Sequence, residues 1–133
     1  MTNDEIEEFE KIYGQFEGLH KEISLLSKKS PNDAINKFKL SFINKLLAQA
    51  HIVLDEKQRP FEDFDRFDED QLPTNSDITM IFEQYLNCFE KLRTENIKHT
   101  WTYNGDKYVE KWVWLIEGEG SELQTAPPKK IKR

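Results

Sequence analysis

The chain has a single cysteine, no long apolar run, and only five glycines and five prolines among its 133 residues. Cys88 cannot form an internal disulfide by itself, and three scattered histidines do not complete a four-ligand zinc site. No stretch approaches the roughly 18 apolar residues that cross a membrane, and the N-terminus lacks the basic and apolar regions of a signal peptide. We therefore expect a cytoplasmic protein that binds no membrane, metal or cofactor.

Recognisable catalytic motifs are also missing. The sequence contains no glycine-rich phosphate loop, no GxSxG turn for a nucleophilic serine and no HExxH zinc motif. Its acidic residues are plentiful, but none lies beside an apolar shelter that would raise the pKa of a carboxyl for acid–base catalysis. These absences predict a protein that is not an enzyme.

Charge and aromatic content are what the chain has in abundance. Charged residues make up 33% of the sequence, aromatic residues 12%, and the net charge is −6. An acidic balance disfavours non-specific nucleic-acid binding by the body of the protein. The length fits one domain with a real core. We assign residues 1–118 to this domain and residues 119–133 to a flexible tail, because the chain after Gly118 shows no periodicity.

Three segments carry apolar residues at the spacing of amphipathic helices. The first covers residues 4–27 and has Gly14 and Gly18 on one face, which a close helix crossing or a kink would explain. The second covers residues 30–54, and its wide apolar arc predicts a central helix packed on two sides. The third covers residues 74–96 and completes a bundle that buries all three apolar faces.

The second helix has a distinct start signal. The hydroxyl of Ser30 can cap the helix, and Pro31 suits its first turn. The connection before Ser30 is short, so the first two helices should form an antiparallel hairpin.

After His99 the pattern changes to the alternation of β-strands. Asn104–Gly105 is a preferred dipeptide of type I′ turns and predicts a β-hairpin in which Trp101 faces Tyr108. Side chains alternate between the faces of a strand, so one face collects five aromatic residues: Trp101, Tyr103, Tyr108, Trp112 and Trp114. This face either caps the bundle as part of the core, or stays partly exposed and binds a protein, a peptide or a base.

The predicted fold class is therefore α+β, mainly α: a three-helix bundle with a C-terminal β-hairpin packed on it. The outgoing strand of the hairpin, which continues to Ile116, is longer than the incoming one. Its outer backbone groups would lack a partner, and no other segment resembles a strand. We expect this edge to accept a strand from another protein.

Residues 55–73 combine eight acids and three bases with evenly spaced phenylalanines at positions Phe61, Phe64 and Phe67. One interpretation is a loop whose rings pack on the helices while its acids face water. The other is an acidic segment that docks in a groove of a partner protein. A calcium loop of the EF-hand type does not fit, because the glycine at its sixth position is missing.

The chain ends in a short basic run. A solvated terminus is the usual role of such a run, and contact with phosphate groups is the alternative. If the protein touches nucleic acid, we expect the contact only here, at Lys129, Lys130, Lys132 and Arg133.

Arg93 and His99 have the R-x5-H spacing and resemble the motif of HEPN-type ribonucleases, which are also helical bundles. The resemblance implies that the arginine and the histidine face an RNA phosphodiester across a dimer. The residues themselves suggest simpler roles, with Arg93 solvated and His99 paired across the strands with Glu110.

Taken together, the sequence predicts a non-enzymatic protein-binding module that docks through the aromatic hairpin and the acidic phenylalanine segment. The settings we consider are an accessory subunit of a larger bacterial or viral assembly, including phage defence, and an antitoxin-like or immunity-like inhibitor. The first alternative is an acidic DNA mimic that inhibits a nucleic-acid-binding protein. The second is a HEPN-like ribonuclease that uses Arg93 and His99.

Overall fold

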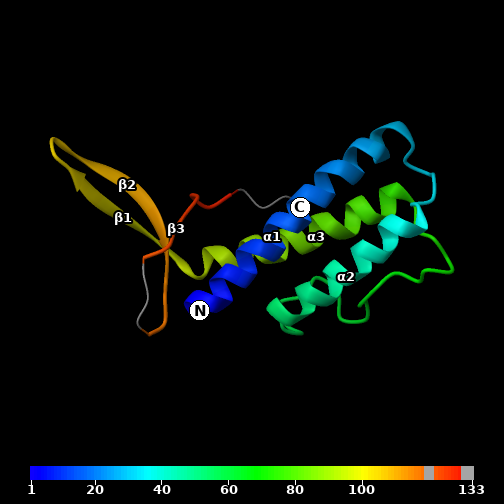
Figure 1. The fold of residues 1–133 in the computed structure, drawn as a ribbon, viewed down its shortest axis with the longest axis horizontal. Coiled ribbons are helices and arrows are strands. Elements are labelled where there is room, and N and C mark those ends of the chain that lie inside the picture. Colours follow the sequence, from blue (N-terminus) through cyan, green and yellow to red (C-terminus); the bar gives the residue numbers. More distant parts are fainter. Residues whose placement is uncertain (119–121, 130–133) are drawn as a thin grey trace.

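The computed structural model describes residues 1–118 and 122–129. Three helices precede an antiparallel sheet with the strand order β1-β2-β3. Figure 1 shows the helices side by side and the β1–β2 hairpin pointing away from one end of them. The prediction of three helices followed by a C-terminal β-hairpin is confirmed. The elements are α1 (Asn3–Lys29), α2 (Lys37–Val53), α3 (Asn75–Thr94), β1 (Ile97–Asn104), β2 (Lys107–Trp114) and β3 (Gln124–Thr125).

Helices α1 and α3 form where the sequence predicts them because both carry strong local start signals. Thr2 caps α1 and Thr74 caps α3, and each helix closes a capping box with an acid three residues later. Their apolar stripes meet in a core of aromatic rings, in which Phe16 contacts Phe82 with ring centres 4.7 Å apart. No helix in the described ranges is both long and apolar enough to cross a membrane.

Helix α2 starts later than predicted, and the prediction of a start at Ser30 is wrong. Ser30 ends α1, since its N–H donates to the carbonyl of Leu26. The following residues bond instead to the segment before α3, where the N–H of Ile35 donates to the carbonyl of Pro73 at 2.9 Å. Asn36 then caps α2 by accepting from a backbone N–H. These bonds to a distant segment outweigh the local signal at Ser30.

The prediction that the second helix is central is also wrong. Helix α1 contacts both α2 and α3, most extensively α3. The wide apolar arc of α2 includes Phe38 and Phe42, which are 72% and 50% exposed. The two rings pack on each other at 5.0 Å, and the ammonium group of Lys45 lies over the ring of Phe42. Only the remaining apolar face of α2 reaches the core.

The two glycines of α1 do not mark a helix crossing. A Cβ atom built at Gly14 or Gly18 would meet nothing within 4 Å beyond its own helix and neighbours. Both residues are exposed on the surface of α1. Neither glycine is therefore required for close packing among the described residues.

Replacing Gly14 or Gly18 with alanine should consequently stabilise the protein by up to about 1 kcal/mol per site, because alanine loses less backbone entropy in a helix. Urea denaturation followed by circular dichroism measures the change. Gly105→Ala serves as the opposite control, since Gly105 has a φ of +67° that alanine adopts only with strain. A destabilised Gly14→Ala or Gly18→Ala variant would contradict the helical geometry described here.

Candidate functional site

The hairpin turns one residue later than predicted. Asn104 pairs with Lys107, which leaves Gly105 and Asp106 in the two-residue turn. Within this turn only Gly105 has a positive φ, at +67°, whereas a type I′ turn needs a positive φ at both central residues. The predicted type I′ turn at Asn104–Gly105 is therefore wrong in type and register.

The shift of the turn does not change which side chains lie on the predicted aromatic face. Moving the turn by one residue changes every cross-strand partner by two positions, so no side chain changes face. Tyr103 now pairs with Tyr108, Trp101 with Glu110, and His99 with Trp112. All five predicted aromatic residues share one face with His99, and we call this surface the aromatic face.

Ring contacts connect the aromatic face from the tip to the base. The rings of Tyr103 and Tyr108 lie 5.1 Å apart at the tip. His99 contacts Trp101 and Trp112, in each case with ring centres 5.0 Å apart. The predicted pairing of His99 with the carboxylate of Glu110 is present at 2.8 Å, although the two residues are diagonal neighbours rather than direct partners. These contacts link the rings in a row along the hairpin.

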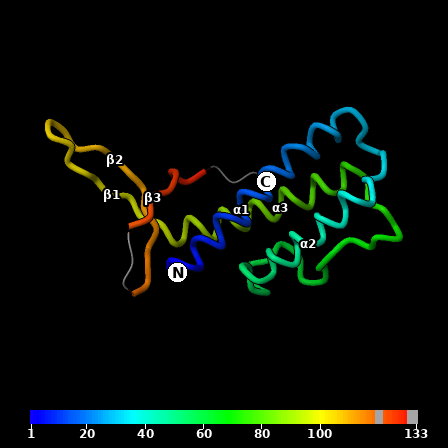
Figure 2. Tube along the Cα trace, in the orientation of Figure 1, coloured from blue at the N-terminus to red at the C-terminus, as the bar shows by residue number. Residues whose placement is uncertain are grey.

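Exposure rises along the row toward the tip. Trp114 is 2% exposed, Trp112 is half-buried, and Trp101, Tyr103 and Tyr108 are 56%, 61% and 68% exposed. Figure 2 shows why, because the outer part of the hairpin extends beyond the helices. Both interpretations of the aromatic face thus apply to different parts of it: the base belongs to the core, and the outer part is open to solvent.

The base of the hairpin is attached to the bundle by Trp114. Its ring packs edge-to-face on Phe9 at 5.3 Å, and its indole N–H donates to the carboxylate of Glu10 at 2.7 Å. The next residues are tied to the start of the chain, since the N–H of Glu117 donates to the carbonyl of Met1 at 2.9 Å. These contacts anchor the base of the hairpin, which we call its root, to the bundle.

The prediction of an open edge on the outgoing strand is wrong at the base of the hairpin. Strands β1 and β2 are equally long, at eight residues each. Strand β3 pairs with β2 at Trp112 and Val113, so the chain supplies its own third strand. The outer edge of β1, by contrast, pairs with no segment within residues 1–118 and 122–129.

The opposite face of the hairpin has a different chemistry. It carries threonines and valines together with three lysines, at Lys98, Lys107 and Lys111. Of these, Lys111 forms an ion pair with Glu122 at 3.0 Å. The hairpin thus presents an aromatic side and a basic side, on a protein whose net charge is −6.

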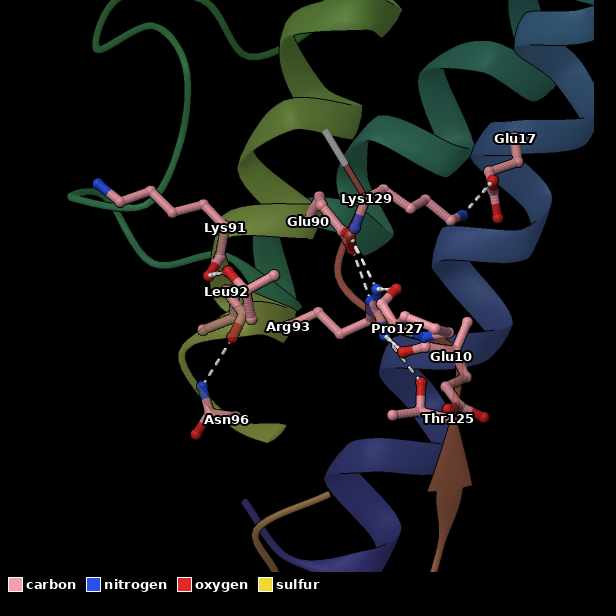
Figure 3. Close-up of polar contacts among 12 residues, drawn as sticks. Glu10, Glu17, Glu90, Lys91, Leu92, Arg93, Asn96, Thr125, Pro127 and Lys129 are labelled. Atoms are coloured by element: carbon pink, nitrogen blue, oxygen red, sulfur yellow. Dashed lines mark hydrogen bonds and ion pairs between the residues drawn. The ribbon is translucent and has the colours of Figure 1, made fainter. Parts of the chain in front are cut away.

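Arg93 lies in a buried polar cluster next to the base of the hairpin, where Thr125 pairs with Trp112 (Figure 3). Its guanidinium group donates twice to the carboxylate of Glu90, at 2.6 and 2.8 Å. It also donates to the hydroxyl of Thr125 and to the carbonyls of Ala126 and Pro127, at 3.0, 2.7 and 2.9 Å. Arg93 is 5% exposed and Glu90 3%. The hydrogen bonds to Glu90 raise the pKa of Arg93 above its ordinary value.

This cluster changes the interpretation of the R-x5-H motif. Arg93 is buried and bound, contrary to the solvated role that the sequence suggested. His99 lies on β1 between two indole rings and binds Glu110. No contact among the described residues joins the two side chains, and each has a separate structural role.

The cluster also orders part of the predicted tail. The backbone N–H of Lys129 donates to Glu90 at 2.8 Å, and its ammonium group binds Glu17 on α1 at 3.0 Å. Residues 125–129 therefore lie against α1 and α3, which the sequence did not predict. The other residues of the predicted basic run, Lys130, Lys132 and Arg133, lie outside the described residues. The pocket beside Arg93, at about 240 Å³, is smaller than the roughly 300–1,000 Å³ of small-molecule sites.

The acidic phenylalanine segment packs largely as a structural loop. Phe67 is 9% exposed, and the side chain of Asn44 on α2 binds both its N–H and its carbonyl, at 2.9 and 3.0 Å. Phe64 is half-buried between Phe67 and Tyr85, and Phe61 contacts Phe64 at 6.2 Å. This arrangement leaves Phe61 as the outermost ring of the three.

Two titratable groups below this loop have perturbed pKa values. Burial lowers the pKa of His51, and burial raises the pKa of Tyr85 to about 12. The histidine ring and the tyrosine hydroxyl are hydrogen-bonded at 2.6 Å. Both shifts favour the uncharged forms, and the partly buried pair joins α2 and α3.

The part of the chain that the structure describes contains no group of three His, Cys, Asp or Glu side chains arranged to hold a metal ion. No protein-family model, curated protein or solved structure matches this chain.

Proposed function

We propose that this protein is a non-enzymatic binding module that docks to a partner protein through the exposed part of its aromatic face. One observation carries the proposal: Trp101, Tyr103 and Tyr108 are each more than half exposed on a hairpin that projects from the bundle. Tryptophan and tyrosine are enriched at the energetic centres of protein interfaces.

The fixed geometry of the rings supports this role. The contact between Tyr103 and Tyr108, and the position of His99 between two indoles, restrict the rotamers of the exposed rings before any partner arrives. Binding then costs less side-chain entropy than it would for free side chains. The acidic phenylalanine segment contributes less to the proposal, because Phe67 and Phe64 are engaged within the protein.

The setting we propose is cytoplasmic, as an accessory subunit of a larger assembly or as an antitoxin-like or immunity-like inhibitor. All of these act by binding and need no catalytic group. The distribution of charge fits such a role, because an acidic body carries an arm whose outer surface is aromatic on one side and basic on the other.

Affinity purification from the native host, using the whole chain, tests this proposal. We expect wild type to recover a stoichiometric partner, and the Tyr103→Ser, Tyr108→Ser double variant to recover at least about tenfold less, as for loss of interface hot spots. The matched control is the Thr102→Ser, Val109→Ser double variant, which changes the neighbouring cross-strand pair on the opposite face. Equal recovery by both variants, or recovery of no partner by wild type, would contradict the proposal.

A further inference from the structure

The outer edge of β1 is a free row of hydrogen-bonding groups. Residues of an antiparallel strand alternate between those bonded to the neighbouring strand and those facing away from it. The N–H of Leu115 donates to the carbonyl of Asn96, so this pair faces inward. The odd-numbered residues that follow on β1 therefore direct their N–H and C=O groups outward: Ile97, His99, Trp101 and Tyr103.

This edge lacks most of the usual protection against pairing. Soluble proteins shield edge strands with prolines, bulges, inward-pointing charges or a covering segment. Strand β1 contains no proline, pairs with β2 without interruption over eight residues, and has one formal charge, on Lys98. No strand of the described chain pairs with its outer side.

We propose that β1 pairs antiparallel with β1 of a second copy of this chain, about a two-fold axis at Trp101. Around that axis, Trp101 faces Trp101 of the second copy, and His99 faces Tyr103 of the second copy. All three residues have outward backbone groups, so the pairs can exchange about six backbone hydrogen bonds. This inference goes beyond the proposed function, because it concerns the edge of the hairpin and not its aromatic face.

The side chains favour a second copy as the occupant. In this register Thr100 faces Thr102, a combination that stabilises cross-strand pairs, and Lys98 faces Asn104. No two like charges are opposite each other. The β1 sequence is therefore complementary to itself around Trp101.

The shape of the molecule makes the pairing compatible with its acidic charge. The hairpins project from the bundles, so that two paired copies place their helices at opposite ends of the assembly (Figure 1). Repulsion between the acidic bodies is weak beyond a screening length of about 8–10 Å. The six strands would form one sheet, and a two-fold axis perpendicular to it keeps both aromatic faces on the same side.

The mass in solution tests the pairing directly. We expect light scattering at about 100 μM protein to give twice the 15.8 kDa of one chain. His99→Pro should raise the dimer dissociation constant at least about tenfold, because proline removes an outward N–H from the β1 edge. Glu110→Pro is the matched control: it loses the same His99–Glu110 contact and places proline at an outward position of β2.

The proposal is overturned if wild type is monomeric at this concentration, or if the two proline variants behave alike. A second measurement does not depend on a proline being tolerated. In a Cys88→Ser background, Trp101→Cys should form an intermolecular disulfide, because facing residues have Cα atoms about 5.5 Å apart. Tyr103→Cys should not, since its facing residue is His99, and disulfides in both variants or in neither count against this register.

These results can be separated from the proposed function. Capture of a partner protein by wild type that is nonetheless monomeric would remove the dimer and leave the docking role intact. A wild-type dimer that captures no partner protein would support the β1 pairing and contradict the docking role.

Discussion

Arg93→Ala should lower the free energy of unfolding by about 3–5 kcal/mol, because it leaves the carboxylate of Glu90 buried without its counter-charge. Both side chains are at most 5% exposed, and they share two hydrogen bonds. The loss extends to the C-terminal segment, where the carbonyls of Ala126 and Pro127 lose their donor. Urea denaturation measures the stability, and hydrogen exchange at residues 124–129 measures the release of the segment.

A matched control and a rescue make this prediction specific. Lys91→Ala removes an exposed cation from the same turn of α3 and should change the stability by no more than about 0.5 kcal/mol. The Glu90→Gln, Arg93→Met double variant removes both charges and should be more stable than Arg93→Ala alone. If Arg93→Ala and Lys91→Ala were equally mild, the buried ion pair would not hold the segment.

The second large effect is expected at Trp114. Trp114→Ala should cost about 3–5 kcal/mol, the usual range for removing a large buried aromatic side chain. The ring is 2% exposed and packs on Phe9, and its N–H binds Glu10. Since these contacts anchor the hairpin root, amide signals from β1 and β2 should shift more than those of the helices in nuclear magnetic resonance spectra.

Trp101→Ala provides the contrast within the same face of the same hairpin. Its side chain is 56% exposed, so we expect a change of about 0.5 kcal/mol or less. The two tryptophans have the same chemistry and differ in burial. Similar losses for both variants would mean that the outer part of the aromatic face is buried in solution, which would contradict the basis of the proposed function.

The features that the sequence predicted correctly depend on local signals. The apolar spacing that predicted α1 and α3 involves residues within one or two helical turns. The aromatic face was also predictable, because strand alternation is unaffected by the error at Gly105. Single-sequence reasoning succeeds where the determining contacts are between near neighbours.

The features that it missed depend on contacts between distant residues. Ser30 has the local signature of a helix cap, but the backbone bonds between residues 31–35 and residues 73–76 overrule it. Nothing near Glu90 or Arg93 indicates that the chain returns more than thirty residues later to bind them. Strand β3 is two residues long, which is too short for any periodic pattern.

The fixed root of the hairpin has a mechanical consequence. Trp114 is clamped on α1, and Glu117 is bound to Met1, so the arm has little freedom to swing where it leaves the helices. A strand of eight residues extends roughly 25 Å. A partner bound at the tip of the hairpin would therefore be kept at a set distance and orientation from the acidic body, and the hairpin would act as a rigid spacer.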